Sequence, residues 1–307
     1  MKTRLISMAL ALLAAASLAT GCTAKPSQTL TIGVLPDVDS IPIIIAQEKG
    51  FFDKEGVDVV IEHFKSAPDR ESALQAGSLD GAVSDMLSAA FLTEGGFKVA
   101  MTSMTNGSYK LLAGPAMNGS TDIKGQSIAI STNTIIEYAT DNMLAKLGLT
   151  PEEVEKTAIP QIPVRLEMLQ NGQVGAATLP EPLASVAVKG GATVLDSTDN
   201  LGINPGVLLF KTDVIESKNT EIVAFYKAYN SAVEYLETAP VSEYAGILVD
   251  VAGFPEDVKD SLTLPSYTPA MLPSEADFVN VIAWLKEKGL IQQVYQYGEL
   301  VDKSFVK

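Results

Sequence analysis

The 307-residue chain has one cysteine, Cys22, and one histidine, His63. A lone cysteine cannot close an intrachain disulfide. With one thiol and one imidazole, the chain also lacks the ligands of most zinc sites and has only a single histidine for a Ser-His triad. His63 lies in the alternating segment 57–64, a pattern typical of a strand surface. We therefore predict no catalytic residue, no bound metal and no cofactor.

Basic residues are also scarce, with 22 Lys and Arg against 37 Asp and Glu and a formal net charge of −15. An acidic surface repels nucleic acids and anionic lipid headgroups, so we expect no nucleic-acid partner. Beyond Arg4, the only arginines are Arg70 and Arg165. Both fall within or just before predicted helices, and we expect them on outer surfaces.

Long apolar runs are rare, and one of them lies at the N-terminus. Lys2 and Arg4 precede an apolar stretch over residues 5–16, and small residues follow. This is the layout of a secretory signal peptide, and the stretch is shorter than the roughly 20 residues that span a bilayer. We predict a signal peptide over residues 1–21 and export of the chain.

Cys22 directly follows this leader, after the sequence Leu18-Ala19-Thr20-Gly21. The segment resembles the lipobox of bacterial lipoproteins, in which the cysteine is acylated, with palmitate among the chains, and becomes the mature N-terminus. We predict lipidation at Cys22, a tether linker over 22–28 and a chain held at the cell membrane on its extracytoplasmic face. The alternative is a plain signal peptide with an incidental cysteine.

Short strand patterns alternate with helical patterns along the rest of the chain. Strands are expected over 29–35, 57–64, 81–83, 97–104, 110–113, 127–130, 157–159, 175–178, near 194 and over 207–210. Helices are expected over 40–49, 69–76, from 84 onward, and over 133–147, 164–171, 221–237, 243–251, 256–262 and 274–288. Strands separated by helices predict an α/β fold with mostly parallel sheets.

An internal similarity indicates two lobes of similar build. Residues 74–83 resemble residues 169–178, with four of the ten positions identical. Both segments have the pattern of a helix, a glycine stop and a short strand of small residues.

An ordered set of short segments resembles the solute-binding proteins of nitrate/sulfonate/taurine-type ABC importers and the thiamine-pyrimidine-precursor binders. The segments are 32–34 (Ile-Gly-Val), 44–57, 74–80, 123–130, 169–174, 179–182 and 190–195. The resemblance implies a two-lobed, type II periplasmic-binding-protein fold. It places residues 29–114 and 211–307 in lobe one and residues 115–210 in lobe two, with hinge crossings near 113–115 and 208–211.

Ligands of parallel sheets bind beyond the carboxyl ends of the strands, where helix N-termini point unpaired N–H groups. In a two-lobed protein these edges face one another across a cleft. The polar residues in the corresponding segments are the candidate ligand-binding residues Asp37, Ser40, Ser84, Asp85, Ser131, Thr132, Asn133, Thr134, Glu181 and Asn204. Ser40 and Ser84 have helix capping as an alternative role, and Asn204 has a turn.

The charge of these segments predicts the kind of ligand. They contain no lysine or arginine, whereas Asp37, Asp39, Asp85 and Glu181 are acidic. A strongly anionic ligand usually recruits a guanidinium. We therefore expect a ligand with an amine or ring N–H, such as an aminosulfonate or an aminopyrimidine, rather than nitrate or sulfate. Its anionic or carbonyl end would meet residues 131–134; the alternative for Asp39 is a solvated loop residue.

These inferences predict the substrate-binding lipoprotein of an ABC importer, a monomer whose partners are a small solute and a permease–ATPase complex. Lobe closure would capture the solute for delivery to the permease. One alternative is a ligand-sensing lipoprotein for signalling. Another is an enzyme similar to the pyrimidine synthases on this fold, which depend on a cysteine-rich motif and a histidine that the predicted cleft lacks.

Overall fold

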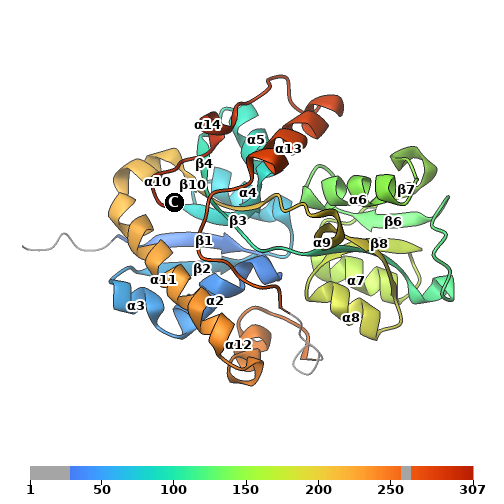
Figure 1. Ribbon diagram of the computed structural model, residues 1–307, viewed down its shortest axis with the longest axis horizontal. Helices are drawn as coiled ribbons and strands as arrows, with labels where there is room; N and C mark the ends of the chain where they lie inside the picture. Colours follow the sequence, from blue (N-terminus) through green and yellow to red (C-terminus); the bar gives the residue numbers. More distant parts are fainter. Residues whose placement is uncertain (1–27, 257–263, 307) are drawn as a thin grey trace, which may run out of the picture.

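A computed structural model describes residues 28–256 and 264–306, which form two lobes side by side (Figure 1). Each lobe contains one five-stranded sheet flanked by helices. The predicted signal peptide, Cys22 and residues 22–27 of the tether lie outside the described residues, as does most of the helix expected over 256–262.

The first sheet has the strand order β2-β1-β3-β10-β4. Its strands are β1 (Leu30–Val34), β2 (Val59–His63), β3 (Gly81–Asp85), β4 (Val99–Met104) and β10 (Gly206–Lys211). Strand β1 pairs in parallel with β2 and β3, whereas β10 runs antiparallel between β3 and β4. Four strands therefore share one direction, and their carboxyl ends meet at one edge.

The second sheet has the strand order β7-β6-β8-β5-β9, the same plan with one antiparallel strand in the fourth place. Its strands are β5 (Tyr109–Ala113), β6 (Ser127–Ile130), β7 (Glu155–Ala158), β8 (Ala176–Pro180) and β9 (Thr193–Ser197). Strand β6 is parallel to β7 and β8, and β5 is antiparallel to β8 and β9. The expected α/β, mostly parallel architecture is confirmed.

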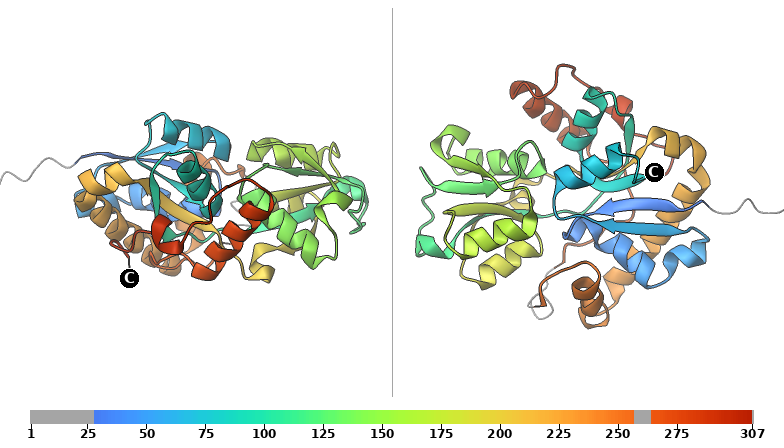
Figure 2. Two further views of the ribbon diagram at one scale, coloured as in Figure 1. Left: turned by 90° about the horizontal axis from the view of Figure 1, so that it is seen from above. Right: turned by 180° about the vertical axis from the view of Figure 1, so that it is seen from behind.

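Helices cover both faces of each sheet (Figures 1 and 2). Lobe one carries α2 (Ile41–Glu48), α3 (Phe51–Glu55), α4 (Ala67–Gln75), α5 (Met86–Glu94), α10 (Thr212–Ser217), α11 (Asn219–Thr238), α12 (Ala245–Asp250), α13 (Glu275–Glu287) and α14 (Tyr297–Leu300). Lobe two carries α6 (Ile135–Lys146), α7 (Ile162–Gln170), α8 (Leu183–Lys189) and α9 (Thr198–Leu201). Short 3-10 helices occupy 38–40, 115–117, 151–153 and 241–243.

Apolar periodicity explains the longest of these helices. Helix α11 buries Ile222, Phe225, Tyr229 and Val233, which recur on one helical face. This face packs against α2 and α3, and Phe225 also contacts Phe210 of β10, in the apolar core of lobe one. A second core runs from α5 and α13 into α6, so apolar packing continues from one lobe to the other.

The chain passes between the sheets at two places that differ from the expected crossings. It leaves the first sheet between β4 and β5, over residues 105–108, and returns between β9 and β10. Strand β5, which we assigned to lobe one, belongs to the second sheet, and β10, assigned mostly to lobe two, belongs to the first. A buried apolar pattern shows that a strand lies inside but does not show which sheet it joins.

Candidate functional site

A small cavity of about 30 Å³ lies between the lobes, at the carboxyl ends of β1 and β3. Lobe one contributes the segments after these strands and α4, and lobe two contributes the loop before α6 and the start of α7. The lobes are closed on it, since backbone N–H groups of Val38 and Ile162 donate across the interface to Glu181 O and Lys65 O, each at 3.0 Å.

The lobe-one wall of the cavity is acidic. Asp37, Asp39 and Asp85 line it, and all three are buried. Asp85 ends β3 and caps α5, accepting a hydrogen bond from the Ser88 N–H at 2.8 Å. Asp39 accepts hydrogen bonds from Thr105 Oγ1 and from the Tyr109 hydroxyl, the latter at 3.1 Å. Asp39 is therefore a bonded core residue rather than a solvated loop residue.

Burial raises the pKa of each of these three carboxyls. The pKa of Asp37 lies well above its usual value because of burial and the nearby Asp39 charge. Burial also raises the pKa of Asp39, although its two hydroxyl donors oppose the change. Burial, with repulsion from Glu71, raises the pKa of Asp85 to about 6. A ligand that supplies N–H donors or positive charge would relieve this repulsion.

Arg70 lies within this acidic wall, and its expected place on an outer surface is wrong. It is 2% exposed, on the inner face of α4. Its guanidinium donates to Val83 O at 2.5 Å, to Ser84 Oγ at 3.0 Å and to Glu71 Oε1 at 2.6 Å. Arg70 is thus largely committed to bonds within lobe one.

Arg165 faces the cavity from lobe two, and its expected surface position is also wrong. It is 0% exposed, on α7. Its Nη1 donates to Ile159 O at 3.0 Å and to Pro160 O at 3.2 Å, whereas Nε and Nη2 have no hydrogen-bond partner among the described residues. Burial lowers the pKa of Arg165 to about 9. The site therefore holds an incompletely partnered cation opposite three carboxyls.

The two arginines occupy equivalent positions in the two lobes. They are separated by 95 residues, the same offset that relates 74–83 to 169–178. Each follows a proline in the first turn of its helix, Pro68 in α4 and Pro163 in α7. Extending the internal similarity a few residues toward the N-terminus would have shown that the two arginines are equivalent, which our assignment of both to outer surfaces missed.

The predicted polar run before α6 divides between two places. Ser131 and Thr134 are buried and line the cavity, and Ser131 Oγ has no partner in the described part of the chain. Thr134 caps α6 by accepting from the Ile136 N–H at 3.2 Å. Thr132 and Asn133 are exposed and line a neighbouring, more open hollow together with aromatic side chains of lobe one.

The remaining predicted residues also divide. Ser84 lines the cavity and joins Arg70 to Glu71. Three others do not belong to its lining: Ser40 donates to Asp37 Oδ1 at 3.0 Å, Glu181 pairs with Lys110, and Asn204 Nδ2 donates to Thr105 O at 2.5 Å. Asn204 thereby ties the two crossings together.

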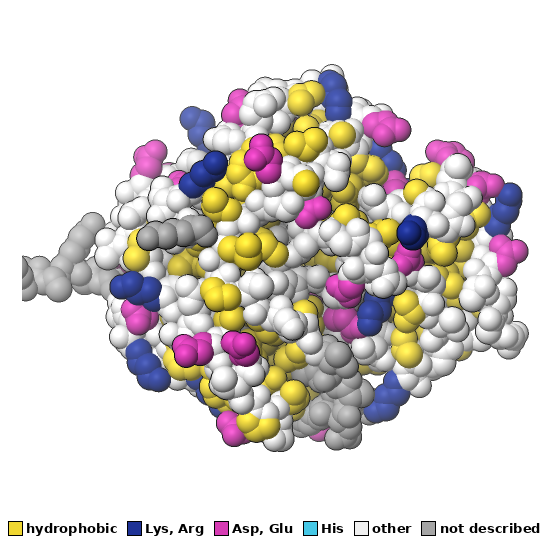
Figure 3. Space-filling view, in the orientation of Figure 1, with side chains coloured by type: hydrophobic (Ala, Val, Ile, Leu, Met, Phe, Trp, Pro, Cys, Tyr) yellow, Lys and Arg dark blue, Asp and Glu magenta, His cyan; other side chains and the backbone are white. Residues whose placement is uncertain are grey.

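Two further findings concern the described residues only. They contain no group of three or more His, Cys, Asp or Glu side chains suited to a metal ion. They also contain no helix long and apolar enough to span a membrane. The face seen in Figure 3 shows acidic and basic side chains scattered rather than gathered into a basic patch.

The sequence matches the NMT1-like family over residues 23–248. The chain belongs to the NMT1-like family. It is 26% identical to a protein of Bacillus subtilis (strain 168) named as an aliphatic sulfonates-binding protein, over 249 residues that cover 78% of this chain and 74% of that protein. It is 23% identical to a protein named as an ABC transporter periplasmic binding protein of Brachyspira hyodysenteriae over 263 residues, with coverages of 78% and 76%.

A solved structure shares the fold of this NMT1-like chain. The alkanesulfonate-binding protein SsuA of Xanthomonas axonopodis pv. citri, bound to MOPS, superposes with a TM-score of 0.75 at 20% identity. The match covers 92% of this chain and 100% of that one. The expected periplasmic-binding-protein fold is confirmed, and these relatives are named as binding proteins rather than enzymes.

Proposed function

We propose that this chain is the substrate-binding lipoprotein of an ABC importer, which captures a small polar organic solute between its lobes and delivers it to a permease–ATPase complex. The family, the names of the relatives and the closed two-lobed fold support this proposal. In the open form a solute would contact one lobe only. Contacts to both lobes exist only after closure, so solute binding shifts the population toward the closed form.

The observation that carries the choice of solute is Arg165, an incompletely partnered guanidinium opposite a wall of buried carboxyls. A buried charge is costly unless it is paired, so a ligand with charge of both signs suits both walls. Its anionic oxygens would accept from Arg165 and Ser131. Its N–H donors would meet Asp37 and Asp85, each of which can accept about four hydrogen bonds.

A zwitterionic aminosulfonate fits this pattern best. Nitrate and sulfate offer Arg165 an anion but present no donor to Asp37 and Asp85. An aminopyrimidine offers N–H donors to the carboxyls but no anion to Arg165. The arginine thus supports the ligand class that we expected, although we derived that expectation from a supposed absence of arginine.

The lipid anchor is a separate part of the proposal, because Cys22 precedes the described residues and the cavity is built entirely from residues 35–180. Protein with Cys22→Ala should leave the membrane fraction and still bind its solute. Its small-molecule content, measured by mass spectrometry after purification and denaturation, should include an organic solute with both an amine and an acidic group. Recovery of nitrate or sulfate alone, or loss of binding on removing the anchor, would contradict the proposal.

A further inference from the structure

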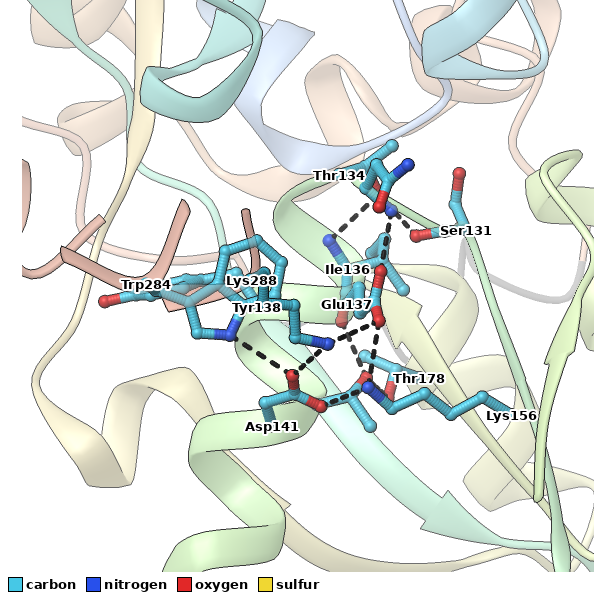
Figure 4. A network of polar contacts seen from close by, with 12 residues as sticks. Ser131, Thr134, Ile136, Glu137, Tyr138, Asp141, Lys156, Thr178, Trp284 and Lys288 are labelled. Carbon is cyan, nitrogen blue, oxygen red and sulfur yellow. Dashed lines mark hydrogen bonds and ion pairs between the residues drawn. The ribbon is translucent and has the colours of Figure 1, made fainter. Parts of the chain in front are cut away.

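Helix α13 lies after residue 248, where the family match ends, and it contacts both lobes. Its apolar side chains Phe278, Ile282 and Leu285 are buried in the core that contains α5 of lobe one. Its other side faces α6 of lobe two (Figures 1 and 4). A change in lobe angle that separates α6 from α13 must therefore break the contacts between them.

Those contacts form a polar network between the lobes (Figure 4). Lys288 Nζ, just after α13, lies 2.9 Å from Glu137 Oε1 and 3.0 Å from Asp141 Oδ2 on α6. Trp284 Nε1 donates to Asp141 Oδ2 at 3.2 Å. The Trp284 ring also meets the Tyr138 ring edge to face, with centroids 5.6 Å apart. One face of α13 thus supplies three kinds of contact to α6.

Two carboxylates of α6 need a second positive charge, which Lys288 of lobe one supplies. Glu137 and Asp141 are only 5% and 8% exposed. Within lobe two, Lys156 pairs with both, at 2.9 Å and 2.5 Å. One ammonium leaves this pair of carboxylates with a net negative charge, and Lys288 from the other lobe balances it. Opening that removes Lys288 leaves a poorly compensated carboxylate, which is unfavourable at a partly buried site.

The same network reaches the ligand cavity. Glu137 Oε2 accepts a hydrogen bond from the Asn133 N–H at 2.7 Å. Asn133 adopts a left-handed conformation, with φ of 57°, next to the cavity-lining residues Ser131 and Thr134. Lys288 therefore binds Glu137, the same side chain that holds the cavity-lining loop 131–134 of lobe two.

We propose that Lys288 and Trp284 form a latch between α13 and α6 that stabilises the closed form and positions the 131–134 loop. They are positioning residues, because they act through Glu137 and Asp141 and do not line the cavity. The latch sets how far the ligand-free protein opens and is a property of the lobes alone. It stands apart from the identity of the solute.

The test uses ligand-free protein and two nitroxide labels. In a Cys22→Ala background the chain has no other cysteine, so Gln75→Cys and Gln170→Cys accept the labels selectively. These exposed residues are the last residues of α4 and α7, the equivalent helices whose first turns line the cavity from the two lobes. Double electron–electron resonance then measures the distribution of distances between the lobes.

Lys288→Ala should shift this distribution toward longer distances, and Lys288→Arg should restore it. The matched control is Lys286→Ala, which also removes one positive charge from α13. The Lys286 side chain donates to Gln292 O within lobe one rather than to α6. The distance distribution of Lys286→Ala should match that of the doubly labelled parent protein.

An unchanged or shorter distance in Lys288→Ala, with circular dichroism showing a folded protein, would overturn the latch. An equal change in Lys286→Ala would overturn it as well, because the effect would then follow net charge rather than the α13–α6 contact. No solute enters the measurement, so failure to bind any aminosulfonate leaves its outcome unaffected.

Discussion

Two arginines at equivalent positions have opposite environments. Arg70 pairs with Glu71 and Ser84 beside Asp85, and it compensates negative charge that is buried with it. Among the described residues, Arg165 has no carboxylate partner within its hydrogen-bonding reach and donates only to backbone carbonyls. Arg70 therefore contributes to the stability of lobe one, whereas Arg165 has hydrogen-bond donors free for the solute that we propose.

This difference predicts opposite effects on stability. Arg70→Met should lower the free energy of unfolding of the ligand-free protein by about 3 kcal/mol, because it leaves buried carboxylates uncompensated. Arg165→Met should leave that free energy unchanged or raise it by up to about 2 kcal/mol, because it removes a poorly compensated buried cation. Urea unfolding of both variants measures the difference, and an equal loss in the two would refute the assignment.

A second residue-scale prediction concerns pH and Asp85. Burial raises the pKa of the folded-state carboxyl from 3.8 to about 6. Between these values the folded state binds more protons than the unfolded state, so the contribution of Asp85 to stability falls as pH rises from 4 to 6. Asp85→Asn keeps an acceptor for the Ser88 N–H. It should stabilise the ligand-free protein by about 1–3 kcal/mol at pH 7.5 and by much less at pH 4.5.

Thermal unfolding at the two pH values checks this prediction. The control is Asp122→Asn on an exposed loop, which should give no pH-dependent change. The same stabilisation of Asp85→Asn at both pH values would show that its charge carries no cost in the folded state.

At the residue scale, the sequence located part of the cavity lining. Asp37, Ser84, Asp85, Ser131 and Thr134 reach the cavity because carboxyl ends of parallel strands gather at one edge, which the alternation of strands and helices already predicts. The arginines were missed because they lie on helices, where the orientation of a side chain depends on which face packs inward. The unpartnered state of Arg165 depends on three-dimensional contacts that no local pattern contains.

At the scale of elements, each of the ten strands lies within or beside an expected strand segment. Short apolar runs bounded by glycine identify buried strands well. Five helices of 4 to 7 residues lie outside the expected helix segments, because such short segments show little periodicity: α3, α8, α9, α10 and α14. The membership of β5 and β10 was wrong because pairing between distant segments is set by the whole fold.

Close packing within the first sheet gives an element-scale prediction. A Cβ at Gly81 in β3 would lie 2.6 Å from both Leu209 O and Phe210 Cδ1 of the neighbouring β10. Because a strand backbone cannot move aside cheaply, Gly81→Ala should destabilise the protein by about 2 kcal/mol. Gly246 in α12 has no such neighbour within 4 Å, and Gly246→Ala should stabilise by about 0.5 kcal/mol.

Urea unfolding of both glycine variants measures these changes. Tolerance of Gly81→Ala without loss of stability would show that β3 and β10 are packed less closely than described.

At the scale of the whole molecule, three polar features accompany the apolar packing that joins α5 and α13 to α6. Backbone hydrogen bonds from Val38 and Ile162 cross the cleft, the cavity places an acidic wall opposite Arg165, and Lys288 joins α13 to α6. In the last two of these, charges of one lobe face charges of the other. A zwitterionic solute would compensate the charges of the acidic wall and of Arg165. Lys288 compensates Glu137 and Asp141 without a ligand.

The most direct test of the proposed function is calorimetric titration of taurine, butanesulfonate, nitrate and an aminopyrimidine into the parent protein and Arg165→Met. The account predicts that taurine binds with 1:1 stoichiometry and more tightly than the other three compounds. Arg165→Met should weaken taurine binding at least about 100-fold. This factor corresponds to a cost of about 3 kcal/mol for leaving the buried sulfonate of taurine unpaired. Lys146→Met, which removes an exposed charge from α6, should change nothing. Tight binding of nitrate, or taurine binding that survives Arg165→Met, would contradict the account.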